Sequence, residues 1–247
     1  MHEIKDILKV AKSCDLVYNR PSEIKKINNI IYIDVLNTEC IVQNNENDVT
    51  VAFNGTEKEI LDVLPHIVRG SKSMRGVGRV HKGYWAKLRI IRDNVLGVLS
   101  AMDSCPSNSM GKDKKKNKKK LYVTGHSLGG AMAQLFTLSD AVASQYDVEC
   151  ITFGSCHPIK HLEKDFYSIP YIQNYYVEDD SLLCNLSGYH NAGDIYEIPK
   201  EGFIRKIDNN YAHCDFKGKD LLENVFKIFA HDFHSIKYYI KQLESKK

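Results

Sequence analysis

Hydrophobic residues along the chain follow two spacings, one typical of helices and one typical of strands. The clearest helical stripe joins Leu88, Ile91, Val95 and Leu99, and a shorter one opens the chain. Helices are therefore expected over 4–18, 84–102, 130–145 and 221–243. Short apolar runs between turn residues predict strands over 30–36, 39–43, 49–53, 121–124, 148–153, 173–177, 194–198 and 203–207.

The order of these segments predicts the fold class. The first three strands are joined by short, Asn-rich links, which favours antiparallel pairing. The middle strands alternate with helices, which is typical of parallel βαβ units. We therefore predict an α/β fold with a mixed, mostly parallel central sheet flanked by helices. Neither a linker nor a repeat divides the chain, so residues 1–247 are expected to form a single domain with a flexible Lys-rich loop at 105–120.

Composition narrows the class of protein. Hydrophobic residues make up 43% and charged residues 26%, which is ordinary globular usage and excludes a disordered or collagen-like chain. An apolar run of about 18 residues, enough to cross a bilayer, does not occur. The N-terminus lacks a signal-like apolar stretch, so a cytoplasmic location is expected, with peripheral membrane contact left open. Seven Cys without a Cys-x-x-Cys pair favour reduced, buried thiols over structural zinc or a disulfide framework.

The positive charge is concentrated in one segment. Residues 112–120 carry seven Lys and one Asp, so this segment accounts for +6 while the whole chain has only +3. The remainder is slightly acidic, which argues against a nucleic-acid partner. A solvated loop is the favoured interpretation of the Lys run. Binding to anionic lipid headgroups is the second, and a nuclear-localisation or nucleic-acid patch, for which interleaved aromatic residues are lacking, is the third.

The segment from Leu121 to Gly130 carries the chemistry. It contains Gly125-His-Ser-Leu-Gly129, a G-x-S-x-G pattern with an apolar strand before it and a helix after it. Such a turn exposes the hydroxyl of the central serine at a helix N-terminus, where the free N–H groups and the helix dipole favour negative charge. Ser127 is therefore the candidate nucleophile.

This segment resembles the nucleophile elbow of the class 3 (fungal-type) lipases, a branch of the α/β-hydrolases. Three further segments resemble family segments in the same order: the oxyanion segment at 51–56, the Val-His-x-Gly-aromatic segment at 80–84, and the strand and Gly after the elbow helix at 151–155. The resemblance implies an α/β-hydrolase fold and a serine esterase that acts on lipid esters without a cofactor.

By this resemblance Ser127 is the nucleophile, and the backbone N–H of Leu128 is one oxyanion donor. Thr56, through its N–H and its hydroxyl, is the other. Each such donor is typically worth about 10²–10³ in turnover.

The resemblance also indicates where the other two catalytic groups lie, because the chain order in this fold is Ser, then Asp, then His. Asp180 fits the family's acid best, and Asp179 is the alternative. His234 fits the base best because aromatic residues follow it at the start of the last helix; His231 is second and His213 third.

Several departures from the family pattern keep other functions open. Asn54 stands where the family has Arg, Leu183 where Pro is frequent, and Cys156-His157 where Pro-Arg is common. A catalytically silent lipid-binding protein therefore remains an alternative, as do phospholipase A1 and acyltransferase activities at the same site.

Residues 57–79 correspond to the family's lid region. A lid that opens at a lipid surface and a core helix with a Gly- and Ser-rich loop at 71–78 are equally compatible with its apolar pattern. His-rich metal motifs are absent from the sequence. The partners expected are a lipid or small ester, with transient contact to a lipid surface, and the oligomeric state is left open.

Overall fold

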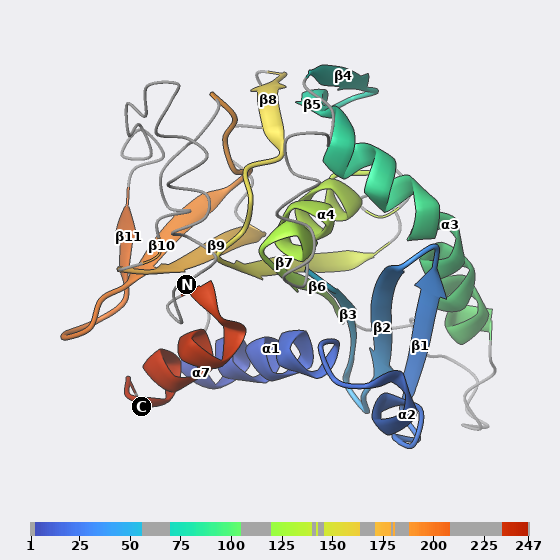
Figure 1. Ribbon diagram of the computed structural model, residues 1–247, viewed down its shortest axis with the longest axis horizontal. Helices are drawn as coiled ribbons and strands as arrows, with labels where there is room; N and C mark the ends of the chain where they lie inside the picture. Colours follow the sequence, from blue (N-terminus) through green and yellow to red (C-terminus); the bar gives the residue numbers. More distant parts are fainter. Residues whose placement is uncertain are drawn as a thin grey trace, which may run out of the picture.

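The fold is built on a twisted central sheet of eight strands (Figure 1). The computed structural model describes residues 3–55, 70–104, 120–139, 142, 146–163, 171–178, 180, 188–207 and 234–246. The strands of the large sheet are, in spatial order, β1 (Ile30–Val35), β2 (Thr38–Asn44), β3 (Asp48–Phe53), β6 (Lys120–His126), β7 (Asp147–Phe153), β9 (Ile172–Val177), β10 (Asp194–Ile198) and β11 (Arg205–Ile207).

Strand direction in this sheet follows the connections. β1, β2 and β3 pair antiparallel through tight turns, and β10 and β11 form an antiparallel hairpin at the other edge. The five strands from β3 to β10 are parallel to their neighbours. This arrangement confirms the predicted mixed, mostly parallel sheet, and it places the carboxyl ends of five strands along one edge.

Helices cover both faces of the sheet (Figure 1). α1 (Ile4–Leu16) and α7 (Ile236–Glu244) pack together on one face, and α3 (Lys82–Ser104) and α4 (Leu128–Thr137) lie on the other. Each face encloses its own apolar cluster. The single turn α2 (Pro21–Ile24) leads into β1.

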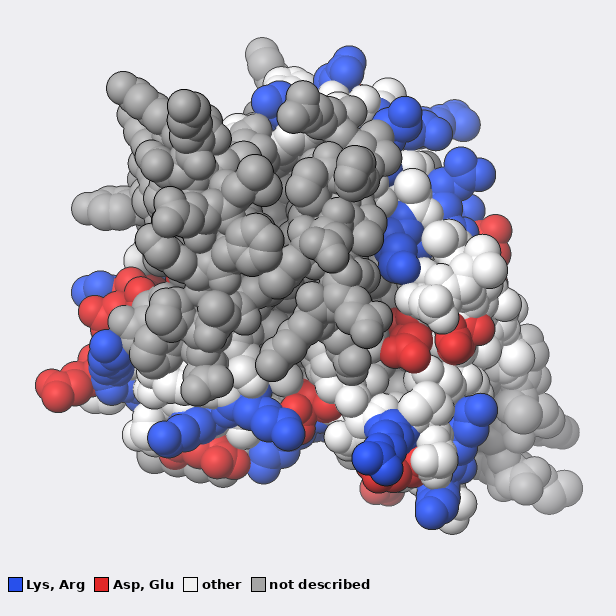
Figure 2. All heavy atoms as spheres, viewed as in Figure 1, with Lys and Arg blue, Asp and Glu red and all other residues white. Residues whose placement is uncertain are grey.

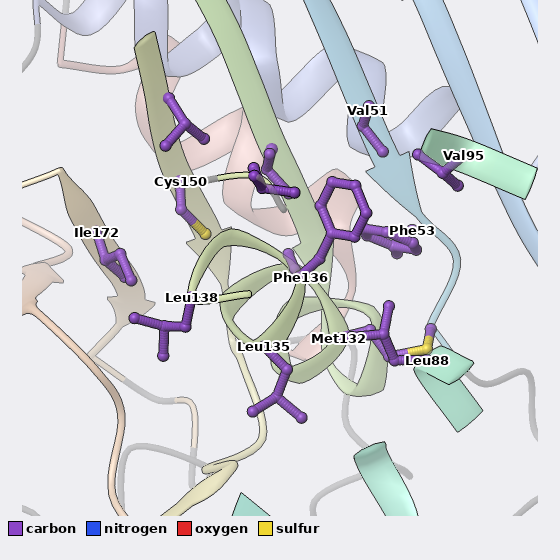
Figure 3. Close-up of a cluster of buried hydrophobic side chains, with 14 of the residues drawn as sticks. Val51, Phe53, Leu88, Val95, Met132, Leu135, Phe136, Leu138, Cys150 and Ile172 are labelled. Atoms are coloured by element: carbon purple, nitrogen blue, oxygen red, sulfur yellow. The ribbon is translucent and has the colours of Figure 1, made fainter. Parts of the chain in front are cut away.

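The core beneath α4 is densely apolar (Figure 3). Every residue of α4 is buried, because the helix lies between the sheet and α3. The rings of Phe53 in β3 and Phe136 in α4 meet edge-on at 5.4 Å between centroids. Leu88 and Val95 complete this cluster from the stripe of α3 that the sequence predicted. The packing fixes the start of α4 against the sheet, and that start carries the nucleophile candidate.

A second, three-stranded sheet corrects one prediction. The Gly- and Ser-rich stretch at 71–78 is not a loop: β4 (Ser71–Met74) and β5 (Gly78–His81) form an antiparallel hairpin. β5 also pairs with β8 (Ile159–Leu162), which the sequence pattern did not predict either. Glycine is used here because Gly78 has a φ of +128° and its Cα faces the backbone of β8 too closely for a side chain.

The boundaries of two predicted helices also differ from expectation. α4 begins at Leu128 rather than at residue 130, and ends at Thr137. Of the predicted helix at 221–243, residues 234–243 belong to the described residues, and α7 begins there only at Ile236. The segments at 105–119 and 57–69, which include most of the Lys run and of the expected lid, lie outside them. In the described ranges, none of the helices has the length and apolar character needed to cross a membrane.

Candidate active site

Ser127 occupies a sharp turn between β6 and α4. Its backbone has φ 57° and ψ −123°, a conformation that side-chain-bearing residues seldom adopt and that costs energy. The surrounding chain holds it there: the N–H of Ser127 donates to the carbonyl of Phe153 at 3.1 Å, and the N–H of Cys156 donates to the carbonyl of Ser127 at 3.1 Å. A Cβ at Gly125 would lie 2.2 Å from the carbonyl oxygen of Gly129, so glycine allows strand and helix to cross this closely. The strand–turn–helix context expected for a nucleophile is present.

Asp180 and His234 meet on the same edge of the sheet. Asp180 follows β9 and His234 precedes α7, and both side chains are buried. His234 Nδ1 lies 2.9 Å from Asp180 Oδ2. This contact joins residues 54 positions apart in the sequence, so the fold and not a local motif brings them together.

Tyr239 extends this pair. Its hydroxyl donates to the same Oδ2 of Asp180 at 2.5 Å. Burial and the neighbouring Asp180 carboxylate raise the pKa of Tyr239 well above its usual value, so the hydroxyl keeps its proton and remains a donor. The aromatic residues after His234 were used only to align that histidine; the structure shows that one of them contacts the acid.

Gly154 lies where these three side chains converge. It follows β7, the strand between β6 and β9, and its φ is +49°. A Cβ here would lie 2.7 Å from Asp180 Oδ2, 2.8 Å from the Tyr239 hydroxyl and 3.0 Å from His234 Cε1. The absence of a side chain at Gly154 is therefore what lets the acid and the imidazole approach the edge of the sheet.

His126, the residue before Ser127, links the elbow to two other elements. Its ring lies 4.5 Å from the ring of His234, centroid to centroid, at an interplanar angle of 39°. Its Nδ1 lies 3.0 Å from the hydroxyl of Tyr18, which follows α1, and that hydroxyl accepts a hydrogen bond from the N–H of Gly55 at 3.1 Å. Burial, and secondarily the adjacent His234, lower the pKa of His126 to about 3, so its imidazole is neutral at physiological pH.

Cys156 is a neighbour of Ser127, the candidate nucleophile. Its thiol is buried and lies within hydrogen-bonding reach of the hydroxyls of Ser127 and Tyr84. Burial raises the pKa of the Cys156 thiol to about 11, which keeps it protonated and poorly nucleophilic. Within the described part of the chain, Cys14, Cys40, Cys150 and Cys156 are all buried free thiols.

A buried polar network supports the elbow from below. The amide of Gln134 in α4 donates to Ser155 Oγ and to Asn191 Oδ1, each at 2.8 Å, and accepts from the N–H of Ala192 at 2.8 Å. Tyr176 then donates to the carbonyl of Ser155 at 2.6 Å. These bonds tie the elbow helix to the loop after β7, which also contains Gly154.

The structure brings together some of the predicted residues and leaves others undescribed. Ser127, Leu128, Asp180 and His234 all lie at the carboxyl edge of the parallel strands. Thr56 lies outside the described residues, one position after Gly55. The alternatives Asp179, His231 and His213 also lie outside them. Among the residues that are described, no group of three or more His, Cys, Asp or Glu is arranged to hold a metal ion.

Comparison with protein families identifies the chain's relatives. The sequence profile of the family described as lipase (class 3) matches residues 50–177, slightly more than half of the chain. The chain belongs to the class 3 lipase family. Members of this family are carboxylic ester hydrolases, and the chain is one of them. A search of curated proteins by sequence found no match.

Solved lipase structures resemble this class 3 lipase family member in fold. The triacylglyceride lipase of Rhizomucor miehei is 21% identical, with a TM-score of 0.57 over 79% of this chain and 80% of that one. The lipase of Rhizopus microsporus var. chinensis is 18% identical, with a TM-score of 0.61 over 94% and 85%. A mutant form of MDLA from Penicillium cyclopium is 14% identical, with a TM-score of 0.65 over 99% and 98%. At these identities the likeness concerns the fold, and it confirms the predicted α/β-hydrolase fold.

Proposed function

We propose that the chain hydrolyses carboxylic esters of lipids, of the triacylglycerol type, with Ser127 as nucleophile, His234 as general base and Asp180 as the orienting acid. The observation that carries this proposal is the buried contact between His234 Nδ1 and Asp180 Oδ2 at the strand edge that also carries Ser127. A serine hydroxyl needs a base to remove its proton, and the base needs a carboxylate to fix its tautomer.

The acylation step uses these groups in order. The Nδ1–H of His234 donates to Asp180, which leaves Nε2 as the unprotonated nitrogen of the ring. Nε2 takes the proton of the Ser127 hydroxyl as the serine oxygen attacks the ester carbonyl. The oxyanion that forms accepts hydrogen bonds from the N–H of Leu128 and from Thr56. Leu128 is the first residue of α4, so its N–H precedes the first hydrogen bond within the helix. His234 then gives its proton to the leaving alcohol.

Deacylation repeats the sequence with water. His234 takes a proton from water, the hydroxide attacks the acyl-Ser127 carbonyl, and the carboxylic acid leaves as Ser127 regains its proton. The imidazolium of His234 is stabilised by Asp180, whose Oδ2 also accepts from Tyr239. The neutral ring of His126 packs beside His234 and adds no competing positive charge.

The proposed nucleophile is tested with a fluorophosphonate probe, which reacts only with an activated serine. The wild-type chain should be labelled and should hydrolyse a short soluble ester, and Ser127→Ala should lose both while its circular dichroism and melting temperature stay unchanged. Ser235→Ala is the matched control, because Ser235 is exposed, adjoins His234 and makes no side-chain cap on α7. Labelling of Ser127→Ala, or a folded wild type that is not labelled, would overturn the assignment.

A substrate panel tests the finer part of the proposal. The triacylglycerol assignment predicts faster hydrolysis of emulsified triacylglycerol than of phospholipid, and release of free fatty acid rather than transfer to an added alcohol. A reversed preference would replace triacylglycerol by a phospholipase A1 or acyltransferase activity at the same Ser127.

A further inference from the structure

A strongly basic surface covers the small sheet and the first half of α3. Residues 70–92 contain seven cations and not one Asp or Glu. We call them the basic surface: Lys72, Arg75, Arg79, Lys82, Lys87, Arg89 and Arg92. Figure 2 shows blue side chains gathered over β4, β5 and the start of α3. Subtracting these seven charges from the net charge of +3 leaves −4 for the rest of the chain.

Most of this charge is not neutralised by the described neighbours. Lys72, Arg75, Lys82 and Arg89 are exposed, and within the described ranges none of these four forms a salt bridge. Arg92 pairs with the adjacent Asp93 at 2.9 Å. The uncompensated cations create a positive field that extends over roughly one Debye length, about 8 Å in physiological salt.

One stripe of α3 combines cations with the only tryptophan of the chain. Lys82, Trp85, Arg89 and Arg92 are spaced by three or four residues and so share one side of the helix, next to the buried Leu88 stripe, against whose cluster Trp85 packs. The Trp85 ring is half-buried, and the guanidinium of Arg92 lies over it at 5.7 Å from the centroid. An amphipathic ring among cations is typical of residues that sit at a membrane–water boundary.

The same helix reaches the candidate active site. Tyr84, next to Trp85, packs against Cys156, and the N–H of Cys156 donates to the carbonyl of Ser127 at 3.1 Å. A surface bound at Lys82 and Trp85 would therefore lie close to the nucleophile. For an enzyme that takes its substrate from a lipid phase, this placement shortens the path of the ester to Ser127.

We propose that the basic surface binds the chain to membranes and lipid droplets that carry anionic phospholipid headgroups, and so presents the site around Ser127 to the lipid. The role given to this binding rests on the lipid-ester activity proposed above, but the binding itself does not require catalysis. Each Lys or Arg near an anionic bilayer contributes about 1 kcal/mol, which is roughly fivefold in affinity. Four such cations should therefore make the affinity for an anionic bilayer more than about tenfold higher than that for a neutral one, even after partial screening by salt.

The test uses co-sedimentation with vesicles of phosphatidylcholine alone and of phosphatidylcholine mixed with phosphatidylserine. Every chain carries Ser127→Ala, so the vesicles are not hydrolysed. The test variant combines Lys72→Gln, Arg75→Gln, Lys82→Gln and Arg89→Gln. The control variant removes the same charge from exposed positions near α2 and on α7, which lie away from β4, β5 and the start of α3 in Figure 1. It combines Arg20→Gln, Lys26→Gln, Lys237→Gln and Lys241→Gln.

The parent chain and the control should bind the anionic vesicles at least about tenfold more tightly than the neutral ones, and the test variant should lose about tenfold or more of that affinity. Trp85 emission should shift to shorter wavelength on binding of the parent chain. If the four-site variant does not fold, Lys72→Gln with Arg75→Gln should still lose about fivefold or more. With Ser127 restored, the test variant should hydrolyse a soluble ester at the wild-type rate, so failure of binding and failure of the proposed function are distinguishable.

Three results would overturn the proposal. Equal loss of vesicle binding in the test and control variants would show that the net charge of the chain, and not the basic surface, determines the binding. Undiminished binding of the test variant would transfer the role to another segment, such as the Lys run at 112–120. Displacement from vesicles by a stoichiometric amount of duplex RNA, with tighter binding to the RNA, would make the partner a nucleic acid.

Discussion

A methyl group at position 154 offers a sharp test of the candidate site. In Gly154→Ala the new Cβ would lie 2.7 Å from Asp180 Oδ2, whereas ordinary contacts begin at 3.4 Å. The acid, or the loop that carries residue 154, must therefore move by about 0.7 Å, and His234 must also yield because its Cε1 lies 3.0 Å from the same methyl. Misplacement of catalytic groups by about 1 Å typically costs about 10² in rate. We expect kcat/KM on a soluble ester to fall between about 10-fold and 100-fold.

The substitution also strains the backbone, so a control must separate strain from displacement. Gly154 has a φ of +49°, where a residue with a Cβ pays about 1–2 kcal/mol. Gly202 has a φ of +84° and open space around its Cα, with no heavy atom within 4 Å of an added Cβ. Gly202→Ala should lose similar stability in urea unfolding while its kcat/KM stays at the wild-type value.

Both variants are compared by urea unfolding, by initial rates on a soluble ester, and by the rate of fluorophosphonate labelling. The labelling rate isolates activation of the serine from release of product. If Gly154→Ala is folded and labels at essentially the wild-type rate, the convergence of Asp180, Tyr239 and His234 on this point does not support catalysis, and the reasoning fails.

Three further predictions follow from buried polar groups. Burial lowers the pKa of His126 to about 3 from its ordinary 6.5, so between these pH values the unfolded chain binds a proton that the folded chain does not. The free energy of unfolding should therefore fall as the pH is lowered, by up to about 1.4 kcal/mol per pH unit. From pH 7 to pH 4 the urea midpoint should fall less steeply for His126→Asn than for the wild type, and an equal fall in both would contradict this. Gln134→Leu leaves three buried partners without their bonds and should cost roughly 2–5 kcal/mol in the same unfolding assay, whereas a loss below about 1 kcal/mol would show that the network relaxes. Tyr239→Phe removes a donor to the Asp180 carboxylate, and a hydrogen bond to a charged group is worth about 1.5–3 kcal/mol. The kcat on a soluble ester should therefore fall about tenfold while KM stays unchanged. An unchanged kcat would limit Tyr239 to a packing role.

The features that the sequence predicted are those set by neighbouring residues. An apolar strand, a Gly-flanked serine and a following helix are encoded within about ten consecutive positions, and the structure has them in place at Ser127. The amphipathic stripe of α3 was likewise predicted, because several turns of regular spacing outweigh local propensity. The order of strands and helices was sufficient to predict parallel pairing in the middle of the sheet.

The small sheet shows where such reasoning stops. β5 pairs with β8 from a distant part of the chain, and Gly, Ser and Lys in the 71–78 stretch hide the alternating pattern of a strand. A short strand is stabilised by its partner more than by its own residues, so the signal for β5 lies largely in β8, and β4 in turn depends on β5. Without that partner the same residues predict a loop.

The surroundings of the candidate site depend on long-range contacts for the same reason. Nothing in the local pattern distinguishes Tyr18 from other aromatic residues at a helix end, yet its hydroxyl joins Nδ1 of His126 to the N–H of Gly55. This bridge connects the elbow at one strand to the segment that leads to Thr56 at the next, and it is supplied by an element at the start of the chain. Because both donors of an oxyanion hole must point at one atom, the distance between these two strand ends matters more than either end alone. Tyr18, which bridges these two strand ends, lies just after α1 and far from both of them in the sequence, whereas a local motif identifies only the elbow that carries the proposed nucleophile.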